Sequence, residues 1–170
     1  MFLTRRRIVL VLAVVAVAGA IIALPYISSL TATGLDRVTV ELSDVKFVPT
    51  SEKQKPGQID IVFHLTNPTD NTVTTSKIEY DLFADNTRLG NSILSFEDIP
   101  PNGRPTILPH QSIDLPDLFQ PSIQPTQAIF NKIVNSPSDI NWKVQGVARI
   151  ETAITLQDKQ FSDDLYPSIG

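Results

Sequence analysis

The side chains best suited to acid–base or metal chemistry are two histidines, His64 and His110, in a chain of 170 residues that has no cysteine. A zinc site needs three or four ligands at suitable spacing, and a blue-copper site needs a cysteine beside two histidines. Neither set of ligands is present, and the only methionine is Met1. We therefore predict two solvated histidines and no metal site.

Two pairs of acidic residues, Glu97-Asp98 and Asp163-Asp164, are the next candidates, because glycoside hydrolysis uses two carboxyl groups that face one cleft. Neighbouring residues of a strand point to opposite faces of its sheet. We therefore predict solvated charges rather than a catalytic acid and base. Weak calcium binding by Asp158, Asp163 and Asp164 is the alternative, although their spacing matches no known calcium loop.

Nucleophilic and phosphate-binding motifs are also missing from the sequence. No G-x-S-x-G elbow marks a serine as the nucleophile of a hydrolase, and the seven glycines are too scattered to form a phosphate-binding loop. Trp142 shares its parity with Val144 and Ile150, which indicates a core position rather than a binding aromatic. We predict no catalytic, cofactor-binding or metal-ligating residue and therefore a protein that is not an enzyme and has no cofactor.

The N-terminal segment has the composition of a membrane anchor. Residues 8–24 contain no polar side chain, and the apolar character continues to residue 30. As a helix, residues 8–30 would span ~35 Å, enough for a hydrocarbon core of ~30 Å. Arg5, Arg6 and Arg7 precede the segment, so the positive-inside rule places the N-terminus in the cytoplasm. We predict a single-pass signal anchor at residues 8–30, a cytoplasmic stretch at 1–7 and an extracytoplasmic C-terminal domain.

Two other interpretations of this segment stay open. The small residues Ala18-Gly19-Ala20 fit a cleaved signal peptide, although the apolar run continues beyond them. The arginine cluster also loosely matches a twin-arginine export signal. Without Arg5–Arg7 the chain holds 11 basic and 18 acidic residues, a net charge of −7. Such a domain repels phosphate backbones, so we predict no nucleic-acid partner.

The rest of the chain alternates apolar and polar residues with the period of β-strands. After a linker at 31–36, this pattern predicts strands at residues 38–47, 59–66, 74–83, 88–96, 142–150 and 151–161. Two short extended pieces are expected at residues 106–108 and 112–115. The last strand is expected to have residues 153–156 at its centre. Asp85-Asn86 is expected to form a tight turn, and residues 126–134 a short helix that begins after Pro125.

These elements predict an all-β domain at residues 37–162. The expected fold is a β-sandwich of about seven antiparallel strands, immunoglobulin/fibronectin-III-like, with one short helix. Eight of the thirteen prolines fall between residues 100 and 137, and residues 116–140 are expected to form a proline-rich insertion. Residues 163–170 are expected to form a polar C-terminal tail.

Four motifs in order resemble the LEA14-like group of late-embryogenesis-abundant proteins, whose domain is also called the water-stress and hypersensitive-response (WHy) domain. They are the alternating strand that ends in Asn67-Pro68, residues 78–83 followed by Leu89-Gly90, the loop at residues 99–103, and residues 142–147 with a central glycine. The resemblance covers residues 38–161. It implies a β-sandwich that protects proteins or membranes under dehydration-type stress, here as a membrane-anchored member.

Alternative functions of a different class remain open. The domain could be an accessory or interaction module of a membrane-protein complex, docking by an edge strand or by the proline-rich segment. It could also hold an apolar ligand such as a lipid between its sheets. Asn67-Pro68 itself is interpreted as structural: proline ends the strand, and the asparagine side chain can bond to the backbone two residues on.

Overall fold

The computed structural model describes residues 13–19, 21, 34–49 and 57–166. The chain divides into two compact units, Met1–Gly34 and Leu35–Gly170. In the first unit, residues 13–19 and 21 are helical, and the remainder of the expected anchor lies outside the described residues. Within the part that is described, no helix has both the length and the apolar content needed to cross a bilayer.

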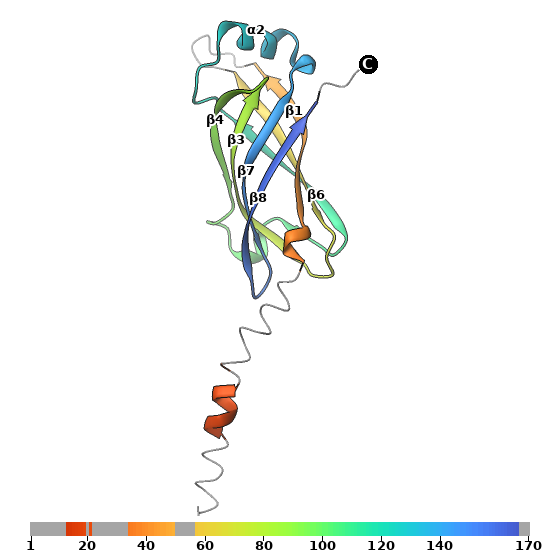
Figure 1. Cartoon of the computed structure of the whole chain (residues 1–170), viewed down its shortest axis with the longest axis vertical. Coiled ribbons are helices and arrows are strands. Elements are labelled where there is room, and N and C mark those ends of the chain that lie inside the picture. Colours follow the sequence, from red (N-terminus) through yellow and green to blue (C-terminus); the bar gives the residue numbers. More distant parts are fainter. Residues whose placement is uncertain (1–12, 20, 22–33, 50–56, 167–170) are drawn as a thin grey trace, which may run out of the picture. The chain divides into compact units, whose positions relative to one another are not determined.

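The second unit is a sandwich of two antiparallel sheets (Figure 1). One sheet has the order β1-β2-β6, made of β1 (Thr39–Val48), β2 (Gln58–Asn67) and β6 (Gln111–Phe119). The other has the order β4-β3-β7-β8, made of β4 (Thr87–Ser95), β3 (Val73–Ala84), β7 (Trp142–Glu151) and β8 (Leu156–Leu165), with β5 (Thr106–Ile107) beside β3. The helices are η1 (Leu35–Arg37), η2 (Pro101–Gly103), α2 (Gln127–Asn135) and η3 (Pro137–Asp139).

The predicted two-sheet antiparallel sandwich with a short helix is confirmed, although several strands differ in length from the expectation. The described residues form eight strands rather than about seven. β6 continues through Pro116 to Phe119, so the expected insertion begins inside a strand. Proline is tolerated there because β6 is an edge strand, whose outer side needs no ladder hydrogen bond. β8 reaches Leu165, so the expected tail at 163–170 starts later.

The expected centre of the last strand is a turn instead. Residues 152–155 connect β7 to β8, and the Thr152 amide donates to the Thr155 carbonyl at 2.8 Å. In return the Thr155 amide donates to the Thr152 hydroxyl at 3.2 Å. The apolar residues in this stretch indicated a buried strand, but this side-chain bond favours a turn there. The prediction of one strand at 151–161 was therefore wrong.

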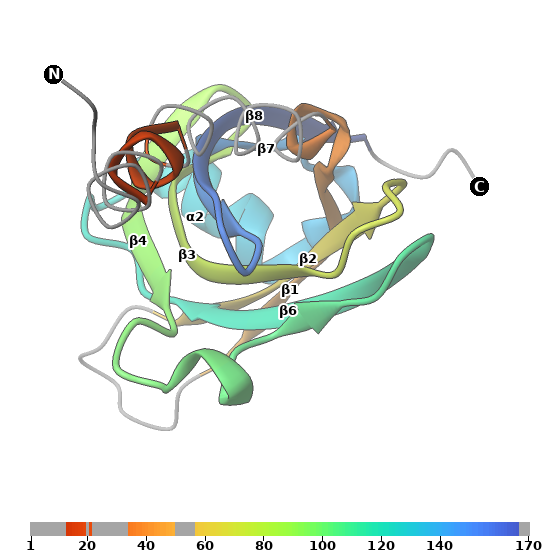
Figure 2. The same ribbon diagram turned by 90° about the horizontal axis from the view of Figure 1, so that it is seen from below.

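Alternating residues of both sheets fill the space between them. Ile59, Ile61, Phe63 and Leu65 of β2 are at most 1% exposed, and Figure 2 shows the two sheets that enclose this space. The Phe63 ring lies edge-on to the ring of Tyr80, with centroids 4.9 Å apart. Trp142 is buried as predicted. The interior is therefore a packed core.

Polar side chains close the two long edges of the sandwich. Along one edge a bulge interrupts β1 between Leu42 and Asp44, and the Leu42 amide donates to the Asp163 carboxylate of β8 at 2.7 Å. On the other side of the sandwich, the Tyr80 hydroxyl of the inner strand β3 donates to the Asp117 carboxylate of the edge strand β6 at 2.6 Å. Burial, reinforced by Asp117, raises the pKa of Tyr80 far above its usual value, so this phenol stays a donor.

The side chain of Asn67 joins three segments at one end of the sandwich. It is completely buried, and its amide nitrogen donates to the carbonyls of Asn71, Ile107 and Leu108 at 2.8, 3.1 and 3.2 Å. Its carbonyl oxygen accepts from the amide and hydroxyl of Thr69 at 3.1 and 2.7 Å. The bond predicted to the backbone two residues on is therefore present, and the same side chain also holds the β5 segment.

We predict that Asn67→Ala lowers the free energy of unfolding by on the order of 3 kcal/mol, because several buried backbone groups lose their partner at once. Urea unfolding followed by the fluorescence of Trp142, the only tryptophan, measures the change. Asn91→Ala is the matched control, since Asn91 is exposed on β4. Equal stability of the two variants would contradict the structural role of Asn67.

Candidate functional site

The two histidines lie on the outside of the sandwich and do not come together. His64 Nδ1 is 2.7 Å from an Asp114 carboxylate oxygen on the neighbouring strand β6, where the two residues are register partners. His110 Nε2 is 2.9 Å from an Asp70 oxygen, between two exposed loops. Each histidine thus has one acidic partner and an exposed ring, which agrees with the prediction of surface histidines.

The acidic pairs serve the architecture instead of forming a site. Arg149 binds Asp158 through two nitrogens at 2.8 and 3.2 Å and reaches Glu97 at 3.1 Å. Asp163 accepts the Leu42 amide. Glu97 was predicted to be a solvated charge and its side chain is 46% exposed, but it also pairs with Arg149. Asp163 differs from the prediction, because its carboxylate accepts a backbone amide. Among the described residues, no three acidic or histidine side chains are placed to hold a metal ion.

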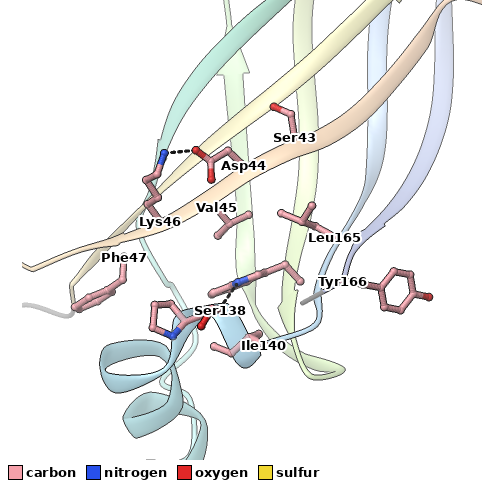
Figure 3. A pocket seen from close by; sticks show the side chains of 11 residues that line it. Ser43, Asp44, Val45, Lys46, Phe47, Ser138, Ile140, Leu165 and Tyr166 are labelled. Atoms are coloured by element: carbon pink, nitrogen blue, oxygen red, sulfur yellow. Dashed lines mark hydrogen bonds and ion pairs between the residues drawn. The ribbon is translucent and has the colours of Figure 1, made fainter. Parts of the chain in front are cut away.

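An open groove of about 570 Å³ lies at one end of the sandwich. Figure 3 shows it between the end of β1, the end of β8 and the segment around η3. Its volume falls in the range of small-molecule sites. Its lining residues are Ser43, Asp44, Val45, Lys46, Phe47, Pro137, Ser138, Ile140, Trp142, Leu165 and Tyr166.

The groove arises from the bulge in β1 and from the turn before β7. The extra residue Ser43 reverses the parity of the strand, so Val45 and Phe47 face the interior where continued alternation would have turned them outward. On the opposite wall the Trp142 indole donates to the Pro137 carbonyl at 3.3 Å. This bond holds the η3 turn against the start of β7.

The groove combines apolar walls with a few polar side chains. Its polar side chains include Ser43, Ser138, Tyr166 and the ion pair of Lys46 with Asp44. The hydrogen bond from Lys46 Nζ to Asp44 raises the pKa of the lysine, so it is a cation rather than a base. A serine nucleophile needs a neighbouring general base, and no histidine lines the groove. An amphipathic molecule with an apolar body and a polar end suits such walls.

Asp85 holds α2 and the start of β7 together at the end of the sandwich that contains the groove. Asp85 and Asn86 have positive φ angles of 46° and 65°, which build the two-residue β3–β4 turn that was predicted. One Asp85 oxygen pairs with Lys132 of α2, and the other accepts the Asn141 amide at 3.0 Å. The hydrogen bond from Lys132 is the main cause that lowers the pKa of Asp85.

Sequence reasoning did not find this groove. Phe47 was expected at the end of a strand, and Tyr166 was assigned to the polar tail. The groove combines the bulge with segments about one hundred residues apart, and neither the bulge nor that pairing has a local signal. The buried tryptophan was the only lining residue with a predicted role, and that role was core packing.

No protein-family model matches the chain, and no curated protein matches it. Solved structures do. The structural genomics target SoR45 has a TM-score of 0.50 at 10% identity, covering 79% of this chain and 92% of its own. AT1g01470 from Arabidopsis thaliana has a TM-score of 0.48 at 11% identity, covering 75% and 80%. A protein named as late embryogenesis abundant (LEA), At2g46140.1, has a TM-score of 0.43 at 12% identity. The match covers 92% of this chain and 90% of that protein. At such identities the likeness to SoR45 concerns the fold alone.

We predict that Asp85→Asn destabilises the domain by on the order of 1 kcal/mol near pH 7, because a half-exposed ionic hydrogen bond is lost. A lowered pKa in the folded state means that the ionised carboxylate contributes above its ordinary pKa of about 3.9 and loses that contribution as the pH falls further.

The difference in free energy of unfolding between the native chain and Asp85→Asn should therefore be at its maximum at pH 6. It should decrease as the pH falls below about 4. Urea unfolding at a series of pH values measures it. Asp98→Asn is the control, because Asp98 lies in an exposed loop. A gap that does not change down to pH 2 would show that ionisation of Asp85 contributes nothing.

Proposed function

We propose that this chain is a non-enzymatic, membrane-anchored LEA14-like domain that protects proteins or the membrane under desiccation or similar stress. The observation that carries the proposal is that the groups able to do chemistry are used in the architecture of the sandwich. Asp163 and Asp117 tie the two sheets together, and Arg149 holds Glu97 and Asp158. What remains outside is an acidic, hydrophilic surface suited to weak contacts.

The positions of the motifs support the LEA14-like assignment. Asn67 of the Asn-Pro motif is the buried node at one end of the sandwich. Gly146, the central glycine of the late strand, lies where a Cβ would stand 2.0 Å from the Glu79 carbonyl oxygen, so its β3 neighbour excludes a side chain. The strand order β1-β2-β6 against β4-β3-β7-β8 also supports the immunoglobulin/fibronectin-III-like assignment.

The membrane location is proposed from the sequence. Residues 8–30 are long and apolar enough to span as a helix, and the three arginines before them favour a cytoplasmic N-terminus. In this arrangement the acidic domain is extracytoplasmic and needs no cysteine for its stability, because its core is large and well packed.

A drying assay tests the protective function. A labile enzyme is dried and rehydrated together with the full chain in lipid nanodiscs. One control contains empty nanodiscs and an equal mass of an unrelated acidic protein. The other contains the Asn67→Ala variant of the full chain in nanodiscs. We expect the native chain to preserve the most activity, because a folded hydrophilic surface is required. Protection no better than that of the unrelated protein would refute the proposal.

Binding of an apolar ligand is a second candidate, and the end groove favours it. The alternative of a lipid between the sheets is less well supported, because Phe63, Ile61 and Leu82 fill that space completely. The groove instead presents Phe47, Trp142 and an ion pair at an open end. A fatty acid or a similar amphiphile matches these walls.

A brominated fatty acid should quench Trp142 in a saturable way if the groove binds apolar ligands, since bromine quenches indole only at close range. The full chain in nanodiscs is titrated and its emission is recorded. Ser138→Phe, which adds a ring at an exposed position of the lining, should reduce the saturable quenching. Ser95→Phe, on β4 away from the groove, should not. Quenching that never saturates would eliminate this candidate.

A further inference from the structure

The β7–β8 hairpin ends in an exposed apolar turn. Ile154 and Leu156 are 60% and 55% exposed, and Ala153 beside them is also exposed. Between Glu151 and Asp158 the turn has no charged side chain. Single exposed apolar residues are ordinary, but three of them gathered at one protruding turn form a small patch of the kind that contacts a partner or a membrane.

Several polar groups of this turn have partners within it or beside it. The Thr152 amide and the Thr155 carbonyl bond to each other, and the Thr155 amide is satisfied by the Thr152 hydroxyl. The two acids that flank the turn are neutralised by arginines: Glu151 lies 2.8 Å from Arg104, and Asp158 is held by Arg149. Entry into a region of low dielectric constant requires this kind of internal satisfaction.

The turn lies at the end of the domain where the chain enters it. Lys159 of β8 donates to the carbonyls of Asp36 and Val38, so η1 packs beside the base of the hairpin. Leu156 is about 10 Å farther along β8 at ~3.3 Å per residue. The hairpin extends beyond η1 in Figure 1. The helix α2 lies at the other end of β7, about 30 Å away.

The length of the connecting chain limits the distance to a bilayer. This step rests on the proposed function, in which residues 8–30 span the membrane. Only residues 31–34 separate that span from Leu35 of η1, and four extended residues cover at most about 14 Å. The bilayer surface would therefore lie within reach of the hairpin turn.

We propose that the β7–β8 turn inserts into the interfacial region of the same bilayer that holds the anchor, with Ala153, Ile154 and Leu156 as its apolar contact. Apolar side chains enter the boundary between headgroups and acyl chains by about 5–10 Å, which is a depth that one hairpin turn can supply. This second contact fixes the orientation of the domain and directs the end groove away from the membrane.

The absence of cysteine allows a direct test with single-cysteine variants of the full chain. An environment-sensitive fluorophore is attached to Ile154→Cys, Leu156→Cys, Val134→Cys or Val17→Cys in phosphatidylcholine nanodiscs with or without spin-labelled lipid. Val134 is the matched control, because it is an exposed apolar residue of α2 at the far end. Val17 lies in the proposed span and reports on the anchor itself.

We expect spin-labelled lipid to quench the fluorophore at positions 17, 154 and 156, and aqueous iodide to leave these three unquenched. At position 134 we expect iodide to quench the fluorophore and spin-labelled lipid to leave it unquenched. Quenching at 17 with equal, water-like behaviour at 154, 156 and 134 would overturn the insertion and leave the anchor standing. A water-exposed position 17 would overturn the anchor and the insertion with it. Lipid quenching at 134 as strong as at 154 would mean unspecific adsorption and would also overturn the proposal.

Discussion

The buried amide of Asn67 is the interaction on which one whole end of the sandwich depends. An asparagine side chain offers two donors and an acceptor without carrying a charge, so it can be completely buried once all of them are used. Here it satisfies carbonyls of the 69–71 turn, of β5 and of the residue that follows β5. Proline at the next position ends the strand. The sequence pair Asn67-Pro68 thus both stops β2 and organises the loops beside it.

Side chains also provide hydrogen bonds along the edges of the sheets, where no further strand pairs with the backbone. A sandwich of three strands against five has free edges that need protection. Asp163 accepts the amide of Leu42 on the edge strand β1, and Tyr80 donates to Asp117 on the other side. These carboxylates would look like candidates for catalysis in the sequence alone. Their structural use favours a role that depends on the surface of the domain.

The two ends of the domain differ in their chemical groups, so they are suited to different surroundings. One end has the groove, with its floor held by Asp85 and α2. The other has the Asn67 node, the entry of the chain and the neutral apolar hairpin turn. If the chain is anchored as proposed, the first end faces away from the bilayer and the second faces it. Protection and ligand binding would then both operate on the outward side.

Local pattern in the sequence determined the strands from β1 to β4, the helix α2, the Asp85-Asn86 turn and the buried side of β2, because the period of burial is a property of each segment by itself. It also determined that Asn67-Pro68 is structural and that Trp142 is in the core. Contacts between distant segments were decided only by the tertiary structure. Leu42 and Asp163 are 121 residues apart, and no periodicity encodes their meeting. The turn at 152–155 was missed because exposed apolar residues look like a buried strand until their surroundings are known.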